Sequence, residues 1–195
     1  MHQTPSNVFR SKRFIVPAGW QQLIDFFGLS INEFLAESSL PAEIREEQQF
    51  TLNTEEIIRF WDALERLVGC FQLVTGIRKF CEISQPPAVL AAICSPDVRS
   101  GLRRYGECKA LTGPVSITLE DFPDHTAIVV DWLVPHERLK PSMVITTLAG
   151  ILDVAQRGTG QRILPLRAEC ALAEEVPESF AVEHLGVPLT MGPRM

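Results

Sequence analysis

The spacing of apolar residues changes near residue 113, and this change limits the fold more than any other feature of the sequence. Before it, apolar residues recur every three or four positions, which is the period of an amphipathic helix. After Gly113-Pro114 the period falls to two, so that Val115, Ile117 and Leu119 alternate with polar residues as in a half-buried strand. Helices followed by strands indicate an α+β fold. We therefore predict a helical N-terminal half packed on a small, mainly antiparallel sheet.

The helical half carries recognisable start and stop signals. Ser30 with Glu33, and Asn53 with Glu56, have the spacing of capping boxes, so each pair is expected to open a helix. Gly28 follows an apolar helical segment and is expected to end it. The predicted helices cover residues 17–27, 30–35, 53–69, 71–83 and 97–111.

The second half is expected to contain strands around one long helix. Two strands, residues 115–120 and 126–134, are joined by a five-residue loop and so form a hairpin. A helix is predicted to begin at Pro141, since proline is tolerated in a first turn, and to end at Gly158. Strands around 162–172 and 186–191 complete a β-β-α-β-β order.

The distribution of charge argues against a DNA reader. The chain has 24 acidic and 18 basic residues, a net charge of −6, whereas phosphate-binding domains carry a basic excess. Residues 21–35 have the helix, glycine turn, helix pattern of a helix-turn-helix. No Lys or Arg lies anywhere from Phe14 to Ile44, although a recognition helix needs them to approach phosphates. This segment is therefore predicted to be a plain helical hairpin.

Motifs of catalysis and metal binding are missing from the sequence. There is no phosphate-binding loop, no G-x-S-x-G, no H-E-x-x-H and no C-x-x-C pair. We interpret His125, His136 and His184 as surface residues in turns, and Cys94 as a buried structural cysteine. No signal peptide or membrane-spanning run is visible. The chain is accordingly predicted to be a cytoplasmic protein with no catalytic residue, metal or cofactor.

Polar residues inside apolar stretches are the candidates for a binding site. Arg167 and Glu169 alternate with apolar residues, and the favoured interpretation is an ion pair on a solvated sheet face. The alternative is a pocket wall between helices and sheet, where aromatic groups bury a ligand and an arginine orients its carboxylate or phosphate. The candidate ligand-binding residues are Trp61, Arg104, Tyr105, Trp132 and Arg167.

Several motifs occur in an order that resembles the N-terminal regulatory domain of AraC/XylS-type bacterial transcription regulators. They are the runs 87–97 (PAVLAAICSPD), 102–105 (LRRY), 109–114 (KALTGP) and 185–189 (LGVPL). The resemblance implies an effector-sensing and dimerisation module that controls a DNA-binding domain. Its expected partners are a small-molecule effector and a second copy of the chain. DNA would be contacted only through a C-terminal helix-turn-helix domain, which we expect to be absent from this chain.

The expected organisation is a flexible N-terminus, residues 1–13, followed by a single effector-sensing and dimerisation domain over 14–195. That domain would consist of a helical part, 14–113, and an α/β part, 114–195. The effector would act by shifting the population between two arrangements of the domain. Two other functions stay open: a small metabolite-processing enzyme, and a protein-interaction module that binds no ligand.

Overall fold

The computed structural model describes residues 12–172 and 175–192 and has an α+β fold, which confirms the predicted class. The described residues divide into two compact units. One falls within Met1–Gly69 and Glu107–Val134, and the other within Cys70–Gly106 and Pro135–Met195. Most of the predicted flexible N-terminus, residues 1–13, lies outside the described residues, and Arg13 is already part of the first strand.

The first unit combines short helices with a two-stranded sheet that the periodicity did not predict. Its elements are β1 (Arg13–Val16), α1 (Trp20–Phe26), α2 (Ile31–Ser38), η2 (Ala42–Glu46), β2 (Phe50–Asn53) and α3 (Thr54–Val68). Strands β1 and β2 pair antiparallel, with Phe14 opposite Leu52, and both of these side chains are buried. The first half is helical as predicted, but it also contains these two strands, which were not predicted. Each has four residues, which is too short for a period of two to be distinguished from other spacings.

The helix starts of this unit follow the capping chemistry in the sequence. The Asn53 side chain accepts a hydrogen bond from the Glu56 backbone, and the Glu56 carboxylate accepts one from the Asn53 backbone, so the predicted capping box of α3 is confirmed. Ser30 caps α2 by accepting from the Glu33 backbone N–H at 3.1 Å, which is one of the two hydrogen bonds of the predicted capping box. Trp20 of α1 packs on Phe34 of α2 with ring centroids 6.4 Å apart, and both side chains belong to the buried core.

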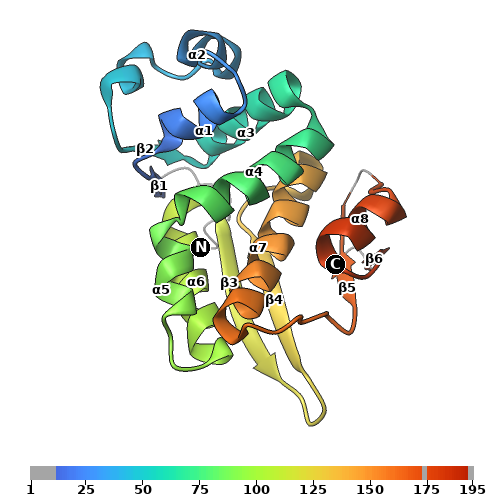
Figure 1. Ribbon diagram of the computed structural model, residues 1–195. Coiled ribbons are helices and arrows are strands. Elements are labelled where there is room, and N and C mark those ends of the chain that lie inside the picture. Colours follow the sequence, from blue (N-terminus) through green and yellow to red (C-terminus); the bar gives the residue numbers. More distant parts are fainter. Residues whose placement is uncertain (1–11, 173–174, 193–195) are drawn as a thin grey trace, which may run out of the picture. The chain divides into compact units, whose positions relative to one another are not determined.

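The predicted hairpin is confirmed as β3 (Val115–Asp121) and β4 (Thr126–Trp132), which pair antiparallel with Val115 opposite Trp132. Figure 1 shows it as a long two-stranded ribbon closed by a short loop. Apolar and polar residues alternate along β3, and residues at every second position of a strand share one face. This alternation therefore places the apolar residues of β3 on one face of the ribbon.

The second unit is built around one long helix. Its elements are α4 (Cys70–Ser84), α5 (Pro87–Ile93), α6 (Val98–Thr112, whose last residues belong to the first unit), η3 (His136–Arg138), α7 (Pro141–Thr159), β5 (Ala168–Cys170), α8 (Glu178–Leu185) and β6 (Leu189–Met191). Helix α7 packs against α4, α5 and α8 (Figure 1). Val74, Ile145, Ala149 and Leu185 form a buried cluster at the meeting of α4, α7 and α8. No described helix has both the length and the apolar character needed to cross a bilayer.

The last part of the chain differs from the predicted order in two respects. The strand expected over 162–172 is only the three residues of β5, and helix α8 stands between it and β6. The pair β5 and β6 is parallel, as a connection containing a helix allows, whereas the other two strand pairs are antiparallel. The predicted locations are confirmed, since β5 lies within 162–172 and β6 within 186–191, but each strand is only three residues long.

Candidate functional site

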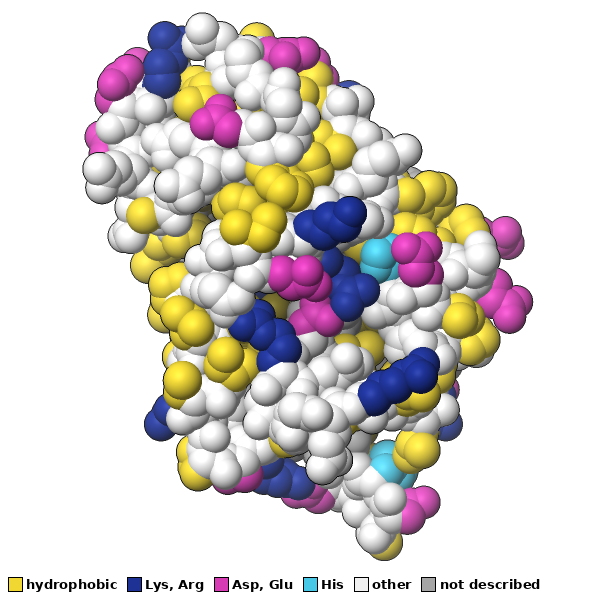
Figure 2. Space-filling model, viewed as in Figure 1, with side chains coloured by type: hydrophobic (Ala, Val, Ile, Leu, Met, Phe, Trp, Pro, Cys, Tyr) yellow, Lys and Arg dark blue, Asp and Glu magenta, His cyan; other side chains and the backbone are white. Residues whose placement is uncertain are grey.

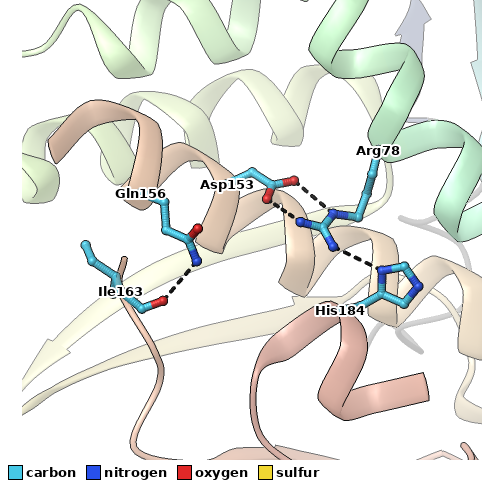
Figure 3. A network of polar contacts seen from close by, with 5 residues as sticks. All are labelled: Arg78, Asp153, Gln156, Ile163 and His184. Atoms are coloured by element: carbon cyan, nitrogen blue, oxygen red, sulfur yellow. Dashed lines mark hydrogen bonds and ion pairs between the residues drawn. The ribbon is translucent and has the colours of Figure 1, made fainter. Parts of the chain in front are cut away.

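Three helices of the second unit place a polar cluster on the surface of the α7 core. We use "polar cluster" for Arg78 and Thr75 on α4, Asp153 on α7 and His184 on α8. Arg78 donates two hydrogen bonds to Asp153, from Nη2 to Oδ1 at 2.6 Å and from Nε to Oδ2 at 3.1 Å (Figure 3). Both side chains are 26% exposed, so this bidentate ion pair is only partly screened by water. It joins α4 to α7 across 75 residues of sequence.

His184 extends the cluster to α8, and its contacts determine which tautomer is present. The Arg78 Nη1 atom lies 3.1 Å from His184 Nδ1, and the Thr75 hydroxyl lies 3.4 Å from Nε2. Because a guanidinium can only donate, Nδ1 must accept and therefore bears no proton. The neutral ring then carries its proton on Nε2, facing Thr75. Burial lowers the pKa of His184 below its ordinary value of 6.5, and the charge of Arg78 lowers it further.

In the region of α4, α7 and α8, Figure 2 shows acidic and basic side chains next to each other. Opposite charges placed side by side hold one another in position and leave little net charge to attract a distant ion. We therefore regard the polar cluster primarily as a junction between helices.

Tyr105 on α6 is a second buried polar group of this unit. It is only 6% exposed, and burial raises the pKa of its hydroxyl above the ordinary value of 10, with Cys81 and Asp153 adding to the shift. Its hydroxyl lies against α7 at Gly150, where an added Cβ would come within 2.5 Å of the hydroxyl oxygen. Glycine at this position of α7 therefore makes room for the phenol.

A small hollow lies near the predicted motif 87–97, between α5, α6 and α7. It has a volume of about 10 Å³, which is enough for about one water molecule. Small-molecule sites are far larger, roughly 300 Å³ or more. The hollow is therefore no effector site, and the residues around it serve to seat α6 on α5. Asp97 contributes by accepting from the Ser100 backbone N–H at 2.8 Å, which lowers the pKa of its carboxyl.

The five candidate ligand residues are distributed over both units. In the first unit, Trp61 lies half-buried on α3, and Trp132 is the half-buried last residue of β4. In the second, Arg104 is exposed on α6, next to the buried Tyr105. Arg167 lies just before β5. Of the three in the second unit only Tyr105 lies in the interior, and the role of all five in binding stays a prediction.

The favoured interpretation of Arg167 as one half of a surface ion pair is confirmed. Its Nε lies 3.3 Å from Glu169 Oε1, and the two side chains are 75% and 48% exposed. Such a pair contributes little to stability, since both charges are solvated. The alternation of these two residues in the sequence places them on the same side of the chain, which brings them together.

Two predictions about single residues are wrong. His184 lies in a helix and is 6% exposed, because the cluster gives each of its ring nitrogens a partner, so it is no surface residue of a turn. Cys94 is exposed at the end of α5, since the helix ends there and the backbone turns toward α6.

His125 forms a hydrogen bond with the carboxylate of Asp124, and the Nδ1–Oδ1 distance is 2.7 Å. This pair lies in the hairpin loop, where the Asp124 side chain is 85% exposed. An exposed pair of this kind has no enclosed volume in which to hold a substrate.

The sequence contained one signal for the residues that were missed. Asp153 is the single charged residue in the run from Pro141 to Gln156, and a lone charge in an apolar helix face requires a partner. Applied to α7, the criterion that selected Arg104 and Arg167 would have found it. Nothing in the sequence identifies Arg78 and His184 as its partners, since they lie 75 residues before it and 31 after it.

Comparison with known proteins places the chain in a family. A family model described as the arabinose-binding domain of AraC transcription regulators, N-terminal, matches residues 28–194. No curated protein matches the chain. The match covers most of the sequence and includes every motif of the resemblance noted above. The chain therefore belongs to the family of N-terminal arabinose-binding domains of AraC regulators, and is a ligand-sensing regulatory domain of a transcription regulator.

Proposed function

We propose that this domain binds a small-molecule effector and, as a dimer, passes the bound state to an attached DNA-binding domain. The observation that carries the proposal is the family match over residues 28–194. The mechanism is a population shift: the effector binds one arrangement of the domain more tightly, and that arrangement becomes the major one. DNA is contacted by the attached domain, since the present chain is acidic and its helical hairpin lacks Lys and Arg.

Arg104, Tyr105 and Arg167 of the second unit and, separately, Trp61 and Trp132 of the first unit are proposed as ligand-binding residues. Tyr105 has the strongest support, because a buried hydroxyl can donate a hydrogen bond that fixes the orientation of a ligand. The two tryptophans offer large apolar surface, and the two arginines offer donors for a carboxylate or phosphate.

Thermal-shift screening against a metabolite library, with arabinose included because the family description names it, tests the sensing function. A compound that binds the folded state stabilises it by mass action and so raises the melting temperature. At a concentration of 100 Kd the free energy of unfolding increases by about 2.7 kcal/mol. We expect at least one compound to act in this way and its affinity to fall in Tyr105→Phe, Trp132→Ala and Arg167→Ala. The variant His136→Gln, at an exposed position of η3, is the control. Unchanged affinity in the three test variants would remove those residues from the site.

Light scattering at high protein concentration tests the dimer. Most soluble oligomers are symmetric homo-oligomers, and two copies are needed to place two DNA-binding domains on paired half-sites. We expect the mass of a dimer, about twice the 21.8 kDa of the chain. The mass of a monomer at the highest attainable concentration would contradict this part of the proposal and leave effector binding untouched.

The rival functions lack a comparable observation. An enzyme needs a titratable cluster around a reacting centre. The Asp124–His125 pair is exposed in a hairpin loop, and Asp153 and His184 are both engaged by Arg78 at a junction between helices. A module that binds only proteins would have no ligand to shift its melting temperature, so the screen distinguishes it from a sensor.

A further inference from the structure

Among the described residues, helix α8 is attached to the rest of the second unit by an apolar surface and by the polar side chain of His184. Ala181 and Leu185 are buried, and Leu185 belongs to the cluster that includes Ile145 of α7. The polar attachment is His184, whose ring meets Arg78 and Thr75 of α4. A helix of eight residues is too short to be stable alone in water, so it depends on these attachments.

Charged groups approach His184 from each helix of the junction. Arg78 of α4 is bonded to the ring, Asp153 of α7 lies behind Arg78, and Glu183 is its neighbour on α8 itself. Strand β6, which also contacts α8, consists of Leu189–Met191 and contains no titratable residue. Of the described residues, the group that contacts Nδ1 is therefore the permanent cation of Arg78.

We propose that the polar cluster is a proton-sensitive latch, in which protonation of His184 at Nδ1 releases α8 from α4 and α7. The added proton occupies the lone pair that accepts from Arg78, so the Arg78–His184 hydrogen bond is lost. It also places two cations 3.1 Å apart in a partly buried position. Asp153 is already engaged by two nitrogens of Arg78 and offsets only part of this repulsion.

The direction of the pH dependence follows from the two states of α8. When α8 is released, the ring is solvated and titrates near 6.5; in the docked state burial and Arg78 hold the pKa of His184 below that value. The proton therefore binds the released state more tightly, and the released fraction rises as the pH falls through 6.5. From pH 7.5 to 5.5 the opening equilibrium of α8 increases by up to about tenfold, while the acidic side chains keep their charge.

Hydrogen exchange of the whole chain, corrected for the intrinsic pH dependence of exchange, measures this opening. The relevant amides are those bonded within α8 and at its end, including Ala181 to the Pro177 carbonyl and Gly186 to the Val182 carbonyl. In the wild type we expect their protection to fall by up to about tenfold between pH 7.5 and 5.5. His184→Gln offers an amide oxygen to Arg78 but no titration, and its protection is expected to be independent of pH in this range.

A control variant and a second measurement make the test independent of how His184→Gln folds. His136→Gln removes an exposed histidine of the same unit and is expected to retain the pH dependence of the wild type. NMR titration of the wild-type His184 ring is expected to give a pKa below 6.5 and a change that accompanies the loss of α8 protection. Protection that stays constant in the wild type, falls equally in His184→Gln, or falls while the ring stays neutral would overturn the latch.

Discussion

Gly101→Ala is expected to lower the free energy of unfolding by about 1–3 kcal/mol, even though alanine is the better helix former. Gly101 lies in α6, and a Cβ built on it comes within 2.7 Å of the Ala92 carbonyl oxygen of α5. Real Cβ atoms do not approach a backbone oxygen so closely. Since the contact is with backbone, it cannot be relieved by turning a side chain, and α5 and α6 must move apart.

Urea denaturation of the wild type, Gly101→Ala and Gly158→Ala checks this prediction. Gly158 lines the same small hollow, but its nearest atom, Ile93 Cα, is at 3.9 Å, which is an ordinary contact. Gly158→Ala is therefore expected to be neutral or stabilising by up to about 1 kcal/mol. Equal midpoints for the two variants, at an unchanged slope, would contradict the close approach of α5 and α6.

The close approach of α5 and α6 also gives a structural reason for Asp97 and Gly101 at the start of α6. Asp97 caps α6 through Ser100, and one turn later Gly101 brings that helix against the end of α5. A capping residue and a small residue four positions apart thus fix both where α6 begins and how near it lies to its neighbour. Asp97, the last residue of the run 87–97 that contributed to the family resemblance, therefore has a structural role, and Gly101 lies between that run and the run 102–105.

How much of the fold could be predicted depended on the length of each element. Helices α3, α4, α6 and α7 each have at least fifteen residues, and their apolar periods or caps were visible in the sequence. The hairpin was visible because β3 alternates over seven residues. Strands β5 and β6 lie within the regions predicted as strands, but each is only three residues long. Strands β1 and β2 were not predicted: each has four residues and exists because a distant segment supplies its hydrogen bonds. That pairing is a tertiary effect which local pattern does not encode.

The candidate site was harder to predict for a related reason. Aromatic and cationic residues near the expected helix–sheet boundary could be selected from the sequence, and Tyr105 proved to be buried. The partners of Asp153 could not be selected from the sequence. Arg78 of α4, Asp153 of α7 and His184 of α8 come together only after the three helices have packed. His184 looked like a surface residue because a single sequence does not reveal which side of a short helix is covered.

Arg78→Met is expected to lower the free energy of unfolding by about 2–4 kcal/mol. This loss is larger than the loss on breaking an exposed ion pair and approaches the loss on breaking a buried one. The substitution leaves the Asp153 carboxylate, 26% exposed, without the two hydrogen bonds that it accepts, and leaves His184 Nδ1 without its donor. The cost is mainly that of a partly buried charge with no partner. Arg167→Met breaks the exposed pair with Glu169 and is the control, expected to cost at most about 0.5 kcal/mol.

The double variant Arg78→Met/Asp153→Leu separates this cost from the packing of the helices. If the loss in Arg78→Met comes from the stranded carboxylate, replacing Asp153 as well removes that charge, and the double variant is expected to regain at least half of the lost stability. Urea denaturation of the two single variants and the double variant gives the coupling energy directly. Losses that simply add would mean that the two side chains contribute independently, and that the bidentate contact between α4 and α7 does not hold these helices together in solution.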